Sequence, residues 1–161
     1  MTVGLKSNGE LSVWLFFWGF LITIVFAVAT VAPADERDPM IPRVPAEKMA
    51  EVKSWNAPFG DARKAPPAIV AEGKKIFEGK GTCHLCHGIS GEGDGPAGLS
   101  LAPTPRNFTN CEFHDSRSDG ELLYVIKFGS PGTAMAPLVP AVVSEEEAWK
   151  IIAYERSLCK K

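Results

Sequence analysis

The sequence predicts a helical domain, residues 68–161, that follows one transmembrane helix and a proline-rich linker. Three observations support this division. Residues 11–32 carry no formal charge, six prolines fall between positions 33 and 66, and the later segments with start and stop signals have the period of an α-helix. Lys plus Arg number 17 and Asp plus Glu number 19, so the chain lacks the basic field typical of nucleic-acid binding.

The uncharged run at residues 11–32 is long enough to anchor the chain in a membrane. As a helix its twenty-two residues would rise roughly 33 Å, which matches the hydrocarbon core of a bilayer. A cleaved secretory signal is the alternative, because small residues around positions 29–34 could be cut. Signal cores are usually only about 7 to 15 residues long, however. Residues 1–32 are therefore expected to hold an N-terminal transmembrane anchor.

Residues 33–67 are expected to form a linker because prolines interrupt them throughout. The six prolines before Pro67 prevent long helices and favour extended backbone. Two interpretations remain open: a disordered tether, or a strap packed on the helical domain or on a partner. Trp55 and Phe59 would be unusual in a purely solvated tether.

The first helix of the domain is expected to run from Pro67 to about Gly79. Proline is well suited to the first turn of a helix, since its missing N–H is not needed there, and glycine is common just after the end. Gly73 lies inside this helix, where glycine costs about 1 kcal/mol relative to alanine. We therefore expect Gly73 to mark close contact with another helix.

Two capping boxes predict the remaining helices. In each, a serine side chain accepts a hydrogen bond from the backbone of a glutamate three residues later, and the glutamate side chain bonds back. The boxes are Ser118 with Glu121, before a helix over residues 122–128, and Ser144 with Glu147, before a last helix through Leu158. The intervening segments 88–105 and 129–140 are rich in glycine and proline and are expected to be loops.

The first helix leads into the sequence Cys83-His84-Leu85-Cys86-His87. The pattern Cys-x-x-Cys-His is the signature of covalent c-type haem attachment, in which each thiol adds to one vinyl group and the imidazole ligates the iron. A redox dithiol needs no following histidine. A zinc site would need further ligands, and the remaining cysteines and His114 are widely scattered. The motif therefore predicts one haem c held by Cys83, Cys86 and His87.

The second axial ligand of that haem is expected to be Met135. This methionine lies in a loop framed by glycine and proline rather than in a helix, where it would be ordinary packing. His114 and an open axial position are the alternatives. Arg106 is a candidate contact to a haem propionate, because a guanidinium can bind a carboxylate through two hydrogen bonds, although an ordinary surface charge is equally compatible with the sequence.

Together these features resemble a class I monohaem cytochrome c. The resemblance covers roughly residues 68–157 and is carried by the CHLCH motif, Gly95-Pro96, the PRNFT segment at 105–109, the GTAMAPL segment at 132–138 and the amphipathic last helix. It implies an all-α fold whose first and last helices cross near the haem. It also implies that the Pro96 carbonyl accepts a hydrogen bond from Nδ1 of His87 and fixes the imidazole.

The resemblance also bears on topology and on the two remaining cysteines. Positive charges flanking residues 11–32 slightly favour the opposite orientation. Haem attachment in the family takes place outside the bacterial cytoplasm, so the haem domain is expected on the periplasmic side of the inner membrane. In that oxidising compartment a Cys111–Cys159 disulfide is the preferred expectation, with two unpaired thiols as the alternative.

The function that these expectations favour is one-electron transfer by a membrane-anchored carrier, not an enzyme. The anchor resembles those of cytochrome subunits in bacterial respiratory or photosynthetic complexes. The expected partners are therefore the membrane and other protein subunits of a redox complex. The alternative is a haem enzyme or gas sensor with an open or His-ligated distal site.

Overall fold

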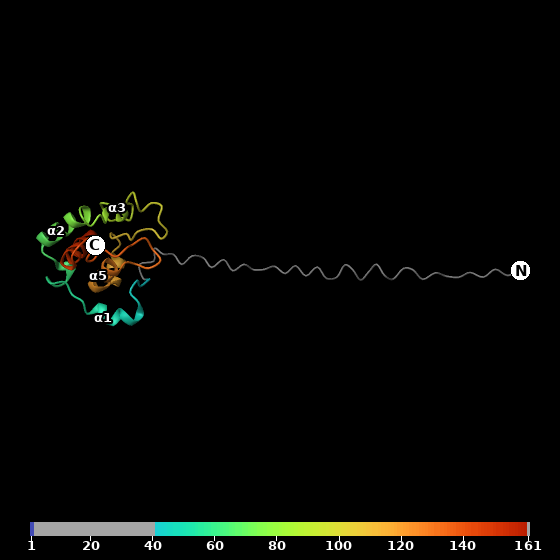
Figure 1. Cartoon of the computed structure of the whole chain (residues 1–161), viewed down its shortest axis with the longest axis horizontal. Helices are drawn as coiled ribbons and strands as arrows, with labels where there is room; N and C mark the ends of the chain where they lie inside the picture. Colours follow the sequence, from blue (N-terminus) through green and yellow to red (C-terminus); the bar gives the residue numbers. More distant parts are fainter. Residues whose placement is uncertain (2–40, 161) are drawn as a thin grey trace. The chain divides into compact units, whose positions relative to one another are not determined.

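The computed structural model describes Met1 and residues 41–160, and within this part the chain folds into helices joined by long loops (Figure 1). Among these residues there is no strand, only an isolated bridge between Ala57 and Gly60. No helix in the described part is long and apolar enough to span a membrane. The expected anchor at residues 11–32 lies outside the described residues.

Two crossing helices, α2 (Pro67–Glu78) and α6 (Glu145–Leu158), form the centre of the domain. A Cβ atom on Gly73 would lie 1.9 Å from the carbonyl oxygen of Lys150, so only glycine allows the two backbones to approach this closely. The close helix contact predicted at Gly73 is confirmed. Beside the crossing, the ring of Phe77 packs edge-on against Tyr154, with centroids 5.2 Å apart.

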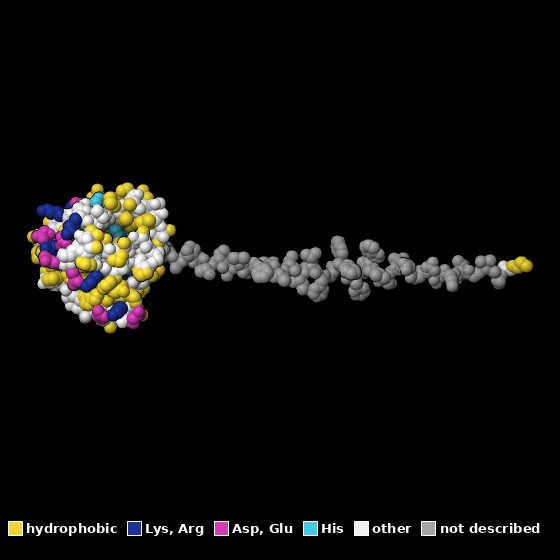
Figure 2. Space-filling view, viewed as in Figure 1, with side chains coloured by type: hydrophobic (Ala, Val, Ile, Leu, Met, Phe, Trp, Pro, Cys, Tyr) yellow, Lys and Arg dark blue, Asp and Glu magenta, His cyan; other side chains and the backbone are white. Residues whose placement is uncertain are grey.

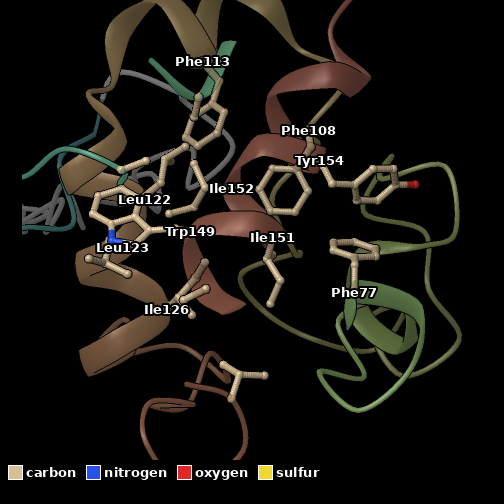
Figure 3. Close-up of a cluster of buried hydrophobic side chains, with 14 residues drawn as sticks. Phe77, Phe108, Phe113, Leu122, Leu123, Ile126, Trp149, Ile151, Ile152 and Tyr154 are labelled. Atoms are coloured by element: carbon tan, nitrogen blue, oxygen red, sulfur yellow. The ribbon is translucent and has the colours of Figure 1, made fainter. Parts of the chain in front are cut away.

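Both predicted capping boxes are present. Ser118 and Glu121 open α5 (Asp119–Phe128), and Ser144 and Glu147 open α6. The buried side chains of α5 and α6 meet in one core, drawn in Figure 3, where Leu122, Leu123 and Ile126 of α5 lie near Trp149, Ile151 and Ile152 of α6.

A short helix that the sequence did not predict, α4 (Cys111–Ser116), follows the PRNFT segment. Its start is capped by Asn110, whose side-chain oxygen accepts a hydrogen bond from the backbone N–H of Phe113 at 3.2 Å. Cys111 at its first position forms a disulfide with Cys159, just after α6. The expected Cys111–Cys159 pairing is therefore confirmed.

Residues 41–64, which we call the strap, pack against the helical domain. They contain η1 (Ala46–Lys48), α1 (Met49–Lys53) and η2 (Ala62–Lys64). Val52 is fully buried, and a Cβ atom on Gly120 of α5 would lie 1.9 Å from its carbonyl oxygen. The ring of Trp55 stacks on Tyr124 at 6.4 Å. Of the two interpretations of the linker, the described part fits the packed strap.

Candidate haem site

A cavity of about 330 Å³ lies between the strap, the CHLCH turn, α5, α6 and the loop that carries Met135. This volume is in the range of cofactor sites. Five of the six predicted site residues line it, namely Cys83, Cys86, His87, Arg106 and Met135, and Pro96 does not. Its apolar wall includes residues of the core drawn in Figure 3, among them Phe108, Phe113 and Ile151.

The attachment turn is a single helical turn, α3 (His84–His87). Thr82 enters it with φ of 51°, a left-handed conformation uncommon outside glycine. Cys83 has helical backbone angles, so Cys86 follows it at helical spacing, and both are free thiols that line the cavity. Burial, together with the nearby Glu155 carboxylate, raises the pKa of the Cys83 thiol to about 12. Two thiols and an imidazole on one turn facing an apolar cavity fit covalent haem c.

His87 is held in the form that can ligate iron. Its Nδ1 lies 3.0 Å from the carbonyl oxygen of Arg106, and a carbonyl only accepts, so Nδ1 carries the proton and Nε2 has the free lone pair. Burial lowers the pKa of His87, which keeps the imidazole neutral. The ring also stacks on Phe108, with centroids 4.5 Å apart and planes 24° from parallel.

The expected hydrogen bond from His87 to Pro96 is corrected to Arg106. The loop after α3 folds back on the attachment turn, and the N–H groups of Gly95 and Ala97 donate to the carbonyls of Cys86 and Leu85. Pro96 lies between these two bonded residues, and it is exposed. Phe108 instead donates to the carbonyl of Gly91, and this bond brings residues 105–108 alongside His87.

The side chain of Arg106 lines the cavity with its guanidinium 5.0 Å from the centre of the Phe113 ring. Arg106 therefore acts on the site in two ways. Its carbonyl orients His87, and its side chain places a positive charge at the cavity wall.

Met135 reaches the cavity from a loop that has its own hydrogen bonds and is also tied to α5, where the Leu138 N–H donates to the Ile126 carbonyl at 2.9 Å. Its carbonyl accepts from the N–H of Ser130 at 2.9 Å, and its N–H donates to Oγ1 of Thr133 at 3.1 Å. Gly129, with φ of 76°, ends α5 and starts this loop. The methionine is half-buried and lines the same cavity as His87.

His114, the competing axial ligand, does not line the cavity. Its Nε2 donates to the carbonyl of Phe108 at 2.7 Å, and its Nδ1 lies 3.3 Å from Nη1 of Arg156. Burial and this neighbouring cation lower its pKa to about 4. Both ring nitrogens of His114 are therefore engaged with other groups of the protein.

Four charged residues at the cavity were not predicted as site residues from the sequence: Arg43, Arg117, Glu121 and Glu155. Burial raises the pKa of Glu155 to about 8, against the opposing effect of Arg156. Glu155 follows Ile151 and Ile152 at helical spacing, so it falls on the apolar face of α6. A carboxylate on that face is the sequence signal that could have predicted it as a site residue. Arg43 and Arg117 carried no such signal.

The surface around α3 is poor in charge. On the face drawn in Figure 2, charged side chains of both signs gather over α2 and α1, and few lie over α3. Leu85, Ile89 and Leu99, on the attachment turn and the loop after it, are exposed apolar side chains. The attachment turn is therefore bordered by apolar surface.

Comparison with solved structures found five matching chains, and two of these structures are described here. The Kuenenia stuttgartiensis reducing HAO-like protein complex Kustc0457/Kustc0458 contains a chain 30% identical, with a TM-score of 0.52 over 59% of this chain and 46% of that one. This chain thus spans about half the length of that relative. The KustC0563 c-type cytochrome is 24% identical, with a TM-score of 0.44 over 55% of this chain and 98% of that one.

A comparison with curated proteins gave no match. Residues 68–154, more than half of the chain, match the family described as cytochrome C oxidase, cbb3-type, subunit III. This stretch contains the attachment turn, Arg106 and Met135, so these cavity residues lie within the family match. The chain belongs to this family and is a class I monohaem cytochrome c that binds haem c covalently.

Proposed function

We propose that this chain transfers single electrons through a haem c whose iron is ligated by His87 and Met135. One observation carries the proposal. The two thiols, the neutral imidazole and the methionine, which come from two distant segments of the chain, line one cavity. Haem c supplies a one-electron couple between ferrous and ferric iron, and His/Met ligation raises its potential relative to His/His ligation.

The residues around the cavity have the roles that electron transfer requires. Cys83 and Cys86 would hold the haem, the Arg106 carbonyl orients His87, and hydrogen bonds within its loop position Met135 as the second ligand. Phe108, Phe113 and the other apolar side chains of the cavity lining would shield the haem from water. His114 is engaged with Phe108 and Arg156, which disfavours the alternative of a His-ligated distal site.

We further propose that residues 11–32 anchor the haem domain on the periplasmic side of the bacterial inner membrane, where it serves a larger redox complex. The support is the length of the uncharged run and the need to attach haem outside the cytoplasm. The related chain from a multi-protein complex supports protein redox partners. An anchor would confine the search for a partner and raise its effective concentration.

Replacing Met135 tests the ligation. We expect the oxidised wild-type protein to show the methionine-to-iron charge-transfer band and its reduced form to bind carbon monoxide slowly. Met135→Leu should abolish the band and speed carbon monoxide binding, because leucine has no sulfur to ligate iron.

Met49→Leu is the matched control, since Met49 lies on α1 and does not line the cavity. This variant should keep the band. Loss of the band in Met49→Leu alone, or its survival in Met135→Leu, would overturn the assignment of Met135.

Membrane attachment has a separate test. Replacing residues 1–32 with a cleavable secretory signal should move the haem protein from the membrane fraction to the soluble periplasmic fraction. Retention in the membrane without residues 1–32 would contradict their proposed role as the anchor.

A further inference from the structure

The leading end of the strap forms part of the cavity. Ile41, Arg43 and Val44 line it together with the attachment turn, and Val44 is only 5% exposed. The family match begins at residue 68, so these three residues lie outside it. The wall that they contribute is therefore a feature of this chain beyond the part that it shares with the family.

The strap is fixed to the domain downstream of these residues. Val52 packs on Gly120 of α5, and the N–H of Ala62 donates to the carboxylate of Asp119 at 2.9 Å. The guanidinium of Arg63 donates to the carbonyl of His114. These contacts hold the strap against α4 and α5. Arg43 therefore belongs to a segment that is packed on the domain.

The charges at the cavity match a ligand with two carboxylates. Arg43, Arg106 and Arg117 contribute three positive charges. Glu121 contributes one negative charge; its carboxylate accepts from the Ser118 N–H at 2.8 Å and lies 4.0 Å from Nε of Arg117. The raised pKa of about 8 keeps Glu155 mostly protonated at neutral pH. The net charge of these side chains is near two positive charges, which would match the two negative charges of the haem propionates.

The guanidiniums of Arg106 and Arg117 are positioned by contacts within the domain. That of Arg106 lies over the Phe113 ring. That of Arg117 donates to the carbonyl of Ser116 at 2.8 Å and lies beside Glu121. Arg43 lines the cavity from a different segment, the strap. A guanidinium is well suited to bidentate contact with a carboxylate.

We infer that Arg43 binds a haem propionate, so that the strap, a segment outside the family domain, helps to set the reduction potential. The inference rests on the proposed haem site in this cavity. A cation beside a propionate favours the ferrous state, which carries one positive charge fewer than the ferric state. It also keeps the propionate ionised by lowering its pKa.

The test is a redox titration of the full-length haem protein with Arg43→Gln, Arg43→Lys and Lys53→Gln. Lys53 is an exposed strap residue that does not line the cavity, so Lys53→Gln removes the same charge elsewhere. Relative to this control, Arg43→Gln should shift the equilibrium toward ferric haem by roughly three- to tenfold, and tenfold equals about 59 mV for a one-electron couple.

Two further readouts distinguish a propionate contact from loss of packing. Arg43→Lys should restore most of the potential, because it keeps the charge. In Arg43→Gln the potential should become more dependent on pH between about pH 5 and pH 8, since the released propionate titrates there. Equal potentials in Arg43→Gln and Lys53→Gln, or no rescue by lysine, would overturn the inference.

Haem content separates this inference from the proposed haem site. Covalent haem should be retained in all three variants and lost in the double variant Cys83→Ala/Cys86→Ala. If the double variant keeps covalent haem, the site itself is wrong. If it loses haem but Arg43→Gln behaves as Lys53→Gln does, only the role of Arg43 is wrong.

Discussion

The two sides of the haem cavity are held in different ways. Behind His87, contacts follow one another through the fold: His87 stacks on Phe108, the Phe108 carbonyl accepts from His114, and His114 meets Arg156, which pairs with Asp119. Met135, by contrast, is held by hydrogen bonds to Ser130 and Thr133 in its own loop.

This difference indicates a rigid side and an adaptable side. The histidine side depends on α4, α5 and α6 together, so damage there should weaken the whole domain. The methionine side depends on a few local bonds, so damage there should alter ligation with little effect on global stability. Substitutions on the two sides should therefore differ in their effect on global stability.

Asp119→Asn should strongly destabilise the domain. Asp119 accepts from Nη2 and Nε of Arg156 at 2.7 and 2.9 Å, and the Arg156 side chain is fully buried. Removing one partner of a buried ion pair leaves a buried charge uncompensated, at a cost of about 3–5 kcal/mol. Chemical denaturation of the haem protein would measure the loss in free energy of unfolding.

Glu51→Gln is the surface control for that experiment. Glu51 pairs with Lys48 at 3.2 Å, and both side chains are more than half exposed. Such pairs contribute about 0–1 kcal/mol. A similar loss in Asp119→Asn and Glu51→Gln would contradict the proposed importance of the buried network on the histidine side.

The two buried titratable groups should give opposite pH dependences. The pKa of His114 is lowered to about 4 from 6.5, so the stability that neutral His114 contributes to the fold is lost as pH falls through that range. The pKa of Glu155 is raised to about 8 from 4.5, so stability decreases as pH rises toward 8. Between pH 6.5 and 8, therefore, Glu155 should change the stability of the fold with pH and His114 should not.

Thermal unfolding of wild type and Glu155→Gln between those pH values isolates the carboxylate. Wild type should lose stability as pH rises, because Glu155 must ionise in an apolar wall. Glu155→Gln should be flatter over the same range. Parallel curves for the two proteins would show that Glu155 ionises without cost.

Thr133→Ala should have the smallest effect on global stability. The Thr133 hydroxyl accepts from the Met135 N–H and donates to the Ser130 carbonyl at 2.8 Å, and such hydrogen bonds contribute about 1 kcal/mol each. We expect the methionine-to-iron band to disappear at a lower denaturant concentration than in wild type, before the helices unfold.

Helical circular dichroism measured on the same samples provides the reference. If helix and band are lost together in both wild type and Thr133→Ala, the methionine loop is coupled to the core and the contrast between the two sides fails.

The parts of the fold that were predictable have local causes. The boundaries of α2, α5 and α6 follow from Pro67 and the two capping boxes, whose partners lie three residues apart. The short helix α4 was missed because its only strong local signal is the cap at Asn110. Its place in the fold depends on burial of Phe113 and His114 and on the Cys111–Cys159 disulfide.

The site shows the same division. The places of CHLCH and Met135 at one cavity could be predicted because their residue types suit haem attachment and iron ligation. The hydrogen-bond partner of His87 could not be predicted, because nearly every residue has a backbone carbonyl that could accept from Nδ1. The folding of the loops places the carbonyl of Arg106 there rather than that of Pro96. The place of Arg43 at the cavity could not be predicted either, since it depends on how the strap packs on the domain, for example at Val52 and Gly120.

X-ray absorption at the iron edge, recorded on the oxidised and reduced protein, tests the central claim most directly. The account predicts a sulfur ligand from Met135 in both states, together with the pyrrole nitrogens and His87. Absence of sulfur from the iron in either state, or a second histidine in its place, would contradict the proposed electron-transfer site.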